Sequence, residues 1–398
     1  MPSIACSIPT RTGGTLTLYK TLRRTMSAYG WDVYALSLCR AGHESDWQEA
    51  AADDGCVRID YDSSNPRSGA RRFVEWCEHR GLDIVIIVDD RVATSAIPHF
   101  SSKIRVVAQA CTIAAVNYRL DTRFLGETDT VIATSPRQYA DLYEIYHVPA
   151  EKLTMVPHGV DIPSWETDSI PHGGTELRLG YVGRLDHVFK GVFYLPKILR
   201  QLDCCATRFH LDIVGTGPAE NRLRQALGEY VQQGSVRFHG HVPNERIYGH
   251  IKAMQVLIIP SIFEGFGLSL IEAMAAGVVP VVSRIRGVTD WIVTHGKTGI
   301  LCGVGDTRAF AQAIASLDRN RKALAAMAIA ARLDAVERFS ADRMAADYRR
   351  LFGRLMRHPS ARRARSWDEY RYEALPYAWL RRLVPRSLKS LIRRWQTA

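Results

Sequence analysis

The stretch Val256-Leu-Ile-Ile-Pro260, followed by Glu264-Gly-Phe-Gly-Leu-Ser-Leu-Ile-Glu272-Ala-Met-Ala-Ala-Gly277, decides the fold of this chain. Its apolar start predicts a buried strand, and the glycines after it predict a turn into a helix that Gly277 ends. Such a turn directs backbone N–H groups and the positive end of the helix dipole beyond the strand. We therefore expect a cradle for an anion and a sugar, with Glu264 and Glu272 facing one crevice. The alternative is a surface helix with two solvated glutamates.

A second cluster, Gly183-Arg184-Leu185-Asp186-His187-Val188-Phe189-Lys190-Gly191, also follows an apolar run. Arg184 and Lys190 would then stand at the end of one strand, facing the glycine turn at the end of another. Two cations and a ring of amides suit one diphosphate. Taken alone, the two basic residues would be read as solvated charge.

Short apolar runs alternate with helical patterns along the whole chain, which is typical of parallel sheets covered by helices. The fold class predicted is α/β, with two Rossmann-like units in tandem. The first half contains strands at Asp32–Leu38, Asp83–Val88, Ile104–Ala108 and Thr130–Ala133, and helices at Leu16–Tyr29, Pro66–Arg80 and Pro136–Tyr146. The second contains strands at Leu177–Val182, Phe209–Val214, Val236–His239, Val256–Pro260 and Val279–Ser283, with an amphipathic stretch at Asn221–Gln232.

The composition of Asp161–Glu176 predicts a linker between the units. Towards the end, Ala309–Phe339 is predicted as continuous helix, and Ser340 as the cap of a further helix from Ala341 to about Met356. The expected domains are residues 1–160, joined by 341–398 packing back on them, and residues 161–340.

The 398 residues carry a formal net charge of +11, of which residues 359–398 contribute +7. The remaining body is close to neutral, which argues against a nucleic-acid-binding protein. The eight cysteines contain no C-x-x-C pair and are expected to be reduced core thiols. No signal peptide or membrane-spanning run is recognised, so we expect a cytoplasmic protein.

Six motifs occur in an order that is typical of one family: VPHGVD, GRLDHVFKG, VGTGP, FHGHVP, EGFGLSLIE and AAGVVPVVS. Over residues 150–305 the chain resembles the retaining GT-B glycosyltransferases of the E-x7-E group, often called family 4. The resemblance implies two facing Rossmann-like domains, a sugar nucleotide held mainly by the second, and transfer with retention and without a metal or other cofactor.

Carried onto this chain, the family's pattern implies that Glu264 binds hydroxyls of the donor sugar and Glu272 those of the ribose. Arg184 and Lys190 would neutralise the departing diphosphate, which fits the need to stabilise charge where it develops. The cradle and the edge of the base pocket would be completed by Phe266, Gly267, Leu268, His241 and Val242. Within VGTGP, Gly215 and Gly217 are expected to let a ligand approach the backbone closely.

In the first half, Gly13 and Gly14 would permit close approach to the donor phosphates, although a plain turn fits as well. Family members often carry a histidine after the strand that corresponds to Ile104–Ala108, but this chain has Gln109-Ala110-Cys111-Thr112 there. The residues considered for the acceptor side are Gln109, Thr112 and Asn117.

Two acidic pairs could suggest a metal site, but we favour solvated loop acids for both. Asp60-Tyr61-Asp62 matches the D-x-D pattern that the GT-A fold uses to hold manganese, and Asp89-Asp90 ends the strand DIVIIV. Both lie in the half of the chain that lacks the diphosphate cluster.

The last residues form a basic amphipathic segment. From 374 to 398 there are six basic residues and no acid, and apolar residues recur at helical spacing. Pro385 should kink or divide the helix. Such a segment can lie on an anionic membrane surface or pack on the first domain.

We therefore expect a glycosyltransferase that moves a sugar from a nucleotide diphosphate, uridine more than guanosine, to a hydroxyl acceptor, such as a lipid-linked or envelope glycan. The alternatives are an NAD-dependent oxidoreductase and, less favoured, a nucleic-acid-binding protein. Against an oxidoreductase, this chain lacks the G-x-G-x-x-G motif that such an enzyme carries after its first strand.

Overall fold

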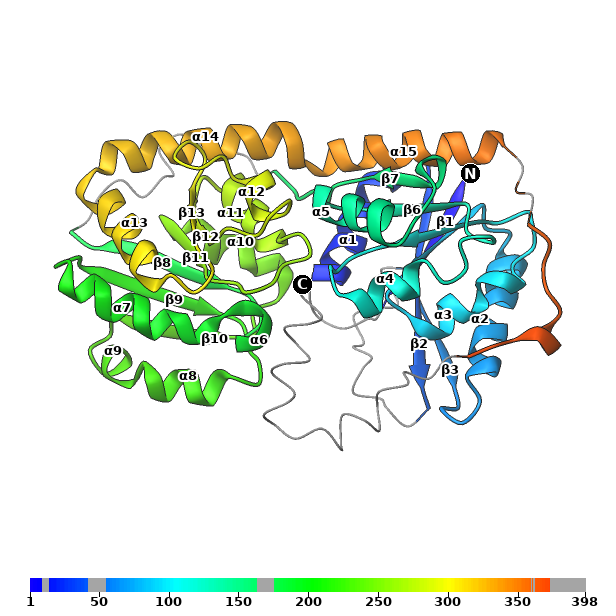
Figure 1. The fold of residues 1–398 in the computed structure, drawn as a ribbon, viewed down its shortest axis with the longest axis horizontal. Coiled ribbons are helices and arrows are strands. Elements are labelled where there is room, and N and C mark those ends of the chain that lie inside the picture. The colour runs from blue at the N-terminus through cyan, green and yellow to red at the C-terminus, as the bar shows by residue number, and fades with distance from the viewer. Residues whose placement is uncertain (9–13, 42–54, 163–174, 359, 361, 373–398) are drawn as a thin grey trace. The chain divides into compact units, whose positions relative to one another are not determined.

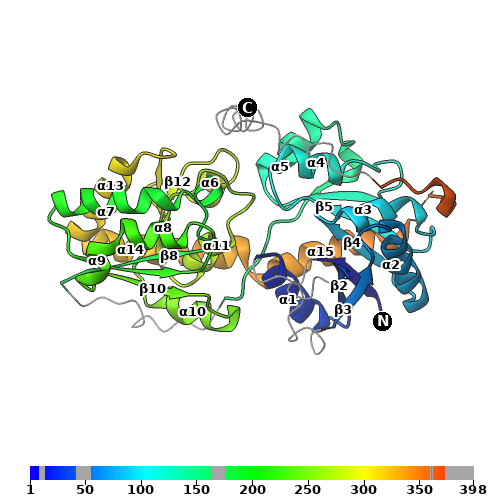
Figure 2. The ribbon, with the colours of Figure 1, turned by 90° about the horizontal axis from the view of Figure 1, so that it is seen from below.

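The computed structural model describes residues 1–8, 14–41, 55–162, 175–358, 360 and 362–372. They form two compact units (Figures 1 and 2). Unit 1 contains Met1–Thr134, Gln138–Pro157 and the described residues from Ala345 onward, and unit 2 contains Ser135–Arg137 and His158–Met344. The predicted fold class is confirmed, because each unit is a parallel sheet with helices packed on its faces.

The sheet of unit 1 has the strand order β3-β2-β1-β4-β5-β6-β7, with every neighbouring pair parallel. Its strands are β1 Ser3–Ser7, β2 Asp32–Arg40, β3 Cys56–Tyr61, β4 Ile84–Val88, β5 Arg105–Gln109, β6 Thr130–Ala133 and β7 Leu153–Met155. The helices are α1 Gly14–Ser27, α2 Pro66–Arg80, α3 Arg91–Ala96, α4 Ala115–Asp121 and α5 Pro136–Ala140. A π-helical turn, Asp141–Ile145, continues α5.

Local sequence chemistry explains where α2 begins and ends. Asn65 caps its first turn through the amide of Ser68, and Pro66 fits the first helical position, where no N–H partner is needed. Gly81 ends the helix in the left-handed conformation at φ 67°. The buried face of α2, including Phe73 and Cys77, then packs with β4 into one core.

The C-terminal helices pack on unit 1, as predicted. Helix α15, Ala341–Arg357, starts at Ser340, whose hydroxyl accepts from the amide of Arg343 at 3.3 Å. Along α15, Phe352 packs against Trp31 with ring centroids 5.5 Å apart. Beyond the helix, the buried Arg362 donates to the carbonyls of Phe100, Ser101, Ile104 and Glu127 and to the carboxylate of Asp129. These bonds hold the C-terminal segment on the sheet.

The sheet of unit 2 has the order β10-β9-β8-β11-β12-β13 and is also parallel throughout. Its strands are β8 Leu177–Val182, β9 Phe209–Val214, β10 Val236–Gly240, β11 Val256–Ile259, β12 Val279–Ser283 and β13 Ile300–Cys302. Its helices are α6 His187–Lys190, α7 Leu195–Cys204, α8 Glu220–Ala226, α9 Gly228–Gln232, α10 Asn244–Lys252, α11 Leu268–Ala275, α12 Thr289–Ile292, α13 Thr307–Arg319 and α14 Arg321–Phe339.

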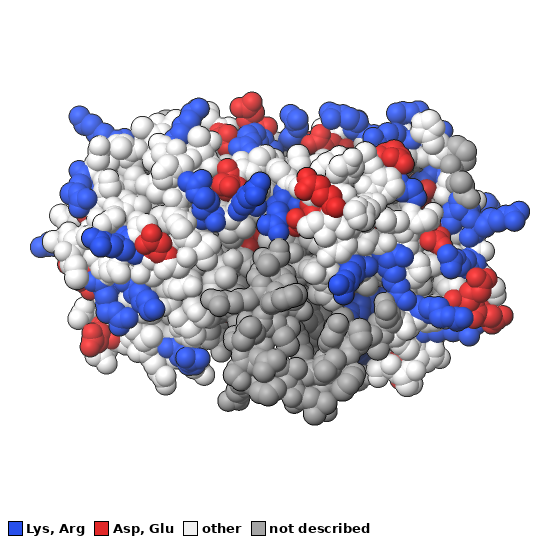
Figure 3. Space-filling view, in the orientation of Figure 1, with Lys and Arg blue, Asp and Glu red and all other residues white. Residues whose placement is uncertain are grey.

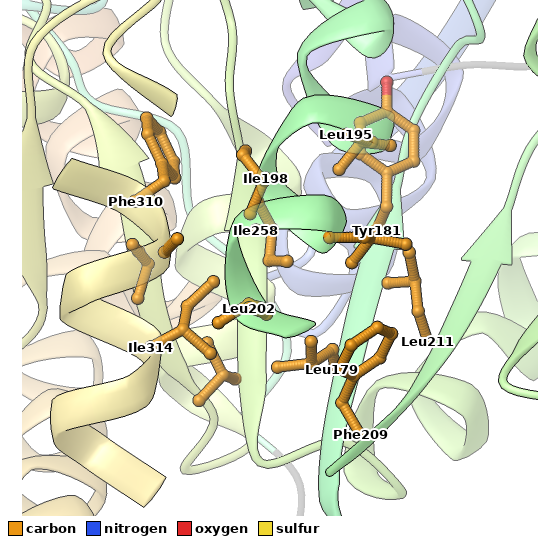
Figure 4. Close-up of a cluster of buried hydrophobic side chains, with 14 of the residues drawn as sticks. Leu179, Tyr181, Leu195, Ile198, Leu202, Phe209, Leu211, Ile258, Phe310 and Ile314 are labelled. Carbon is orange, nitrogen blue, oxygen red and sulfur yellow. The ribbon is translucent and has the colours of Figure 1, made fainter. Parts of the chain in front are cut away.

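Helices cover both faces of this sheet, as the continuous apolar strands require. Figure 4 shows one face, where side chains of α7 and α13 meet those of β8, β9 and β11. The opposite face packs against α10, α11 and α14. Both cores therefore hold β8 and β11 in fixed positions, and the second core also holds α11.

Two predictions about this half were wrong. Ala309–Phe339 is not one helix, because α13 ends at Arg319 and Asn320 caps α14 through the amide of Ala323. Not every cysteine is a core thiol either, since Cys204 is exposed, although all eight are free. Most of the predicted linker lies outside the described residues.

Candidate functional site

The strand order of unit 2 places its two predicted clusters side by side. Strands β8 and β11 are neighbours, while the chain proceeds from β8 to β9 on one side and from β11 to β12 on the other. In open parallel sheets the crevice at such a reversal, beyond the carboxyl ends of the strands, is where ligands bind. The Arg184–Lys190 loop follows β8 and the Glu264 loop follows β11, so both end at this crevice.

An ion pair joins the two loops. The ammonium of Lys190 lies 2.6 Å from Oε1 of Glu264, across 74 residues of sequence. The hydroxyl of Ser261 donates to the same oxygen at 2.7 Å. Glu264 is buried, with 7% of its side chain exposed, whereas Lys190 is about one-third exposed. Oε2 of Glu264 has no hydrogen-bond partner in the described part of the chain, so this oxygen can accept from a ligand hydroxyl.

Backbone bonds fix the ion pair in place. The carbonyl of Phe189 accepts from the amides of Ile262 at 2.8 Å and Phe263 at 3.0 Å. Gly191 has φ 62°, and a Cβ on it would lie 2.0 Å from the carbonyl oxygen of Pro260. Only glycine allows the two loops to approach this closely.

Arg184 and the amides of the glycine turn are further candidate donors, because both follow the strands that end at this crevice. Arg184 is exposed at the end of β8, and its carbonyl accepts from the hydroxyl of Tyr181 at 2.8 Å. Gly267 has φ 109° and starts α11, while Phe266 is buried beside it. Among the described residues, no acceptor is bonded to the backbone N–H groups of Phe266, Gly267 and Leu268, as a cradle for an anion requires.

Glu272 lies on α11, one turn beyond Leu268. Burial raises the pKa of its carboxyl to about 7. Within the residues that the structure describes, this carboxyl makes no hydrogen bond or ion pair. Because Glu272 is only partly buried, a carboxyl with no partner among the described residues can still be reached by a ligand hydroxyl.

The glycines of VGTGP pack closely against the chain itself, and the approach of a ligand to them stays a prediction. A Cβ on Gly215 would lie 2.0 Å from the carbonyl oxygen of Gly183, and one on Gly217 would lie 2.4 Å from that of Leu185. The amide of Leu185 also donates to Thr216 at 2.9 Å. These glycines therefore make room for the neighbouring loop of the chain itself, the loop that carries Arg184.

The remaining donor-side residues of unit 2 follow β10. His241 is exposed and Val242 is half-buried against the apolar core. The carbonyl of Gly240 accepts from the amide of Gly215 at 2.8 Å, which connects this segment to VGTGP. No contact in the structure relates His241 to a base, so its role stays a prediction.

Ser261 and His158 were both missed by the sequence reasoning. His158 is 5% exposed, and its ring lies edge-on to Phe266 with centroids 4.9 Å apart. Burial lowers its pKa to about 4, and its Nδ1 has no hydrogen-bond partner among the described residues. Its place in VPHGVD, one of the quoted motifs, was the available signal.

The acceptor-side residues of unit 1 differ in their surroundings. Gln109 is buried, and its Oε1 accepts from the hydroxyl of Tyr348 on α15 at 3.0 Å. Asn117 donates from Nδ2 to Oδ1 of Asp89 at 2.8 Å. Thr112 is half-buried, and Gly14 is exposed at the start of α1. Gly13 lies outside the described residues.

The acidic pairs of unit 1 are not alike. Asp60 pairs with Arg58 at 2.7 Å, and Asp62 accepts from the amide of Ser64, both at the surface, as predicted. Asp90 is not a solvated acid, because its side chain caps α3 through the amide of Ala93 and burial raises its pKa to about 6. That prediction was wrong for Asp90.

Two features are absent from the residues that the structure describes. No group of three or more His, Cys, Asp and Glu side chains there has an arrangement that could hold a metal ion. None of the helices described is both long and apolar enough to cross a membrane.

Solved structures with the same architecture are GT-B glycosyltransferases. Sucrose-phosphate synthase from Thermosynechococcus elongatus aligns with a TM-score of 0.74 at 21% identity, over 90% of this chain and all of that one. Anabaena HepE in complex with UDP aligns with a TM-score of 0.71 at 16% identity, over 89% of this chain and all of that one. At these identities the likeness defines the fold.

Sequence comparison identifies the family. Residues 12–163 match the model for glycosyltransferase family 4, and residues 166–334 match that for glycosyl transferases group 1. A putative colanic acid biosynthesis glycosyltransferase of Salmonella typhimurium is 31% identical over 43% of each chain. A phosphatidyl-myo-inositol mannosyltransferase of Mycobacterium leprae is 33% identical over 50% of this chain and 52% of its own length. The matched regions span about half of these curated relatives. The chain belongs to glycosyltransferase family 4.

Proposed function

We propose that this protein is a retaining glycosyltransferase that moves a sugar from a nucleotide diphosphate to a hydroxyl acceptor without a metal ion. The observation that carries the proposal is the pairing of Lys190 with the buried Glu264 at the strand reversal of unit 2. The cation, the carboxylate and the amides with no partner among the described residues belong to the two loops that follow β8 and β11, and Arg184 is in the same loop as Lys190. This set matches the diphosphate and the hydroxyls of a sugar nucleotide.

The residues would act on the leaving group. When the bond from the anomeric carbon to the phosphate oxygen breaks, negative charge grows on that oxygen, and Lys190 and Arg184 stabilise it. Glu264 accepts from a sugar hydroxyl and orients the ring. The acceptor oxygen attacks on the same face, and its proton passes to the departing phosphate. Because attack and departure take place on the same face, the configuration is retained without a protein nucleophile.

Uridine is the favoured base, and an envelope or lipid-linked glycan the favoured acceptor. HepE, which shares the fold, is titled as a complex with UDP. The relatives named above act, by their names, in colanic acid biosynthesis and on phosphatidyl-myo-inositol. A cytoplasmic location at the inner face of the membrane belongs to the same proposal.

Thermal denaturation with UDP, GDP, ADP, NAD and a short DNA duplex tests the class of ligand. A ligand that binds only the folded protein raises the midpoint as its concentration exceeds Kd. We expect UDP to give the largest shift. If NAD gives the largest shift of the midpoint, an oxidoreductase is favoured. If DNA gives the largest shift, a nucleic-acid-binding protein is favoured.

Substitutions test the assigned roles, with sugar conjugates of the best nucleotide as donors. Arg184→Ala and Glu264→Gln should each lower turnover by about 10²–10³-fold, as loss of one preorganised group does. Arg178→Ala is the matched control, because Arg178 is exposed at the opposite end of the same strand. Its turnover should stay within about twofold of wild type. Near-wild-type rates in both site variants would remove the assignment.

A further inference from the structure

Unit 1 contains a second strand reversal of the same kind as that in unit 2. Strands β1 and β4 are neighbours, with β2 on one side of the pair and β5 on the other. Asp89 and Asp90 directly follow β4, so they lie at the carboxyl end of the strand where a ligand crevice is expected. Asp89 has φ 46°, an uncommon conformation for a residue other than glycine.

Helix α4 brings two more polar side chains to Asp89. Asn117 donates to Oδ1 of Asp89 at 2.8 Å. Asp121 is four residues further along α4 and therefore lies on the same face of the helix. The carboxyl groups of Asp89 and Asp121 are close enough to interact electrostatically, and the thiol of Cys111 interacts with both. The three polar side chains thus form one cluster.

One buried acceptor of this cluster lacks a donor within the part of the chain that the structure describes. Asp121 is 4% exposed, and its Oδ2 has no hydrogen-bond partner among the described residues. Burial and the charge of Asp89 raise the pKa of Asp121 well above its usual range. Neither carboxyl group forms an ion pair with a lysine or arginine in the described part of the chain. Buried polar atoms are normally satisfied, so an unpaired one indicates a ligand that supplies the missing bond.

We propose that Asp89, Asn117 and Asp121 bind the sugar ring of the acceptor through its hydroxyl or ammonium hydrogens and reject a ring that carries negative charge. The inference rests on the proposed function, since it assigns the acceptor side of the same reaction. Carboxyl oxygens accept hydrogen bonds from O–H and N⁺–H groups alike. An anionic ring would meet Asp89 as a like charge, which binding sites use to exclude wrong partners.

Three probes in each of two sugar series separate these chemistries. Saturation-transfer NMR on the UDP-loaded protein would measure the binding of the methyl β-glycosides of glucose, glucosamine and glucuronic acid, and of the corresponding galactose series. In each series the rings are similar, but the first member carries only hydroxyls, the second an ammonium and the third a carboxylate. We expect the neutral or the ammonium-bearing member of one series to bind at least tenfold more tightly than its carboxylate member. Equal binding of the carboxylate member, or no binding in either series, would overturn the inference.

Two substitutions assign the selectivity to these residues. Asp89→Asn keeps the shape and an oxygen for Asn117 but removes the charge, so discrimination against the uronic acid should fall at least threefold. Asp121→Asn replaces the carboxyl with an amide of the same size, which puts an N–H₂ donor in place of one acceptor, so binding of the preferred ring should weaken. Unchanged binding and discrimination in both variants would contradict the proposal.

A control variant and a measurement of UDP affinity distinguish failure of this inference from failure of the proposed function. Asp62→Asn removes an exposed acid of the same unit and should change neither quantity. UDP affinity, which depends on unit 2, should be unchanged in all three variants. If the protein binds UDP but does not discriminate among the rings, only this inference fails. If it binds no nucleotide, the proposed function fails.

Discussion

At the scale of the residue, the buried carboxyl of Glu272 predicts a pH dependence. Its pKa is raised to about 7 by burial, so the free protein holds it neutral below that pH and ionised above it. An ionised carboxylate accepts ribose hydroxyls more strongly than the neutral acid does. Affinity for the preferred nucleotide sugar should therefore rise about tenfold between roughly pH 6 and pH 8.

Calorimetric titration with a nucleotide sugar measures this effect cleanly, because its diphosphate does not change charge in that range. Glu272→Gln cannot ionise, so its affinity should be lower and nearly independent of pH. A wild-type profile as flat as that of the glutamine variant would show that Glu272 does not contact the ribose.

At the scale of the element, Gly215 should control donor binding without touching the donor. Alanine there would place Cβ 2.0 Å from the backbone oxygen of Gly183, at a φ of 133° that side chains rarely adopt. The loop that carries Arg184 would have to move. Because a displacement of about 1 Å can cost about 10²-fold in a preorganised site, we expect nucleotide affinity to fall at least tenfold.

Gly228→Ala provides the matched control. Gly228 starts α9 in the same unit, and a Cβ there would meet nothing within 4 Å. This variant should bind nucleotide like the wild type and be as stable or slightly more stable in thermal denaturation. If Gly215→Ala binds nucleotide as tightly as the wild type, the packing of Gly215 does not control the position of the loop that carries Arg184.

The strands and helices also show which features could be predicted from local sequence patterns. The strands Leu177–Val182, Phe209–Val214 and Val279–Ser283 were predicted with the bounds that the structure has. Val279–Ser283 is buried along its whole length, and the other two are mostly apolar with one or two polar side chains that are not buried. The break at Asn320 was missed, since the alanine-rich flanks favour helix on both sides and only one capping side chain ends the run. Strand β3, Cys56–Tyr61, was also missed, because Arg58 and Asp60 interrupt its apolar pattern.

At the scale of the whole molecule, the basic C-terminal segment remains a prediction. Residues 373–398 lie outside the described residues. On the face drawn in Figure 3, basic side chains of the described residues are interspersed with acidic ones over both units. A segment with six basic residues and no acid therefore has the stronger attraction for an anionic surface, about 1 kcal/mol for each residue near charged lipid.

Flotation with phosphatidylglycerol-containing vesicles tests this attraction. The full chain should float at low salt and be released by about 0.5 M salt, where the screening length is only a few ångströms. A chain ending at residue 373 and vesicles of phosphatidylcholine alone should both give little binding. If the shortened chain floats as well as the full chain, the membrane contact lies elsewhere. If the full chain does not float, the segment does not bind an anionic membrane.

The sequence by itself determined the alternation of strands and helices, the two glycine turns and the residue types that a sugar nucleotide needs. These features depend on neighbours within about ten residues, whose effects are local. Only the tertiary structure decided that Lys190 bonds to Glu264, that Gly215 makes room for the chain itself, and that Asp121 is left unpaired near Asp89. Those outcomes depend on strand order, because the order of strands in a sheet brings together loops that are distant in the sequence.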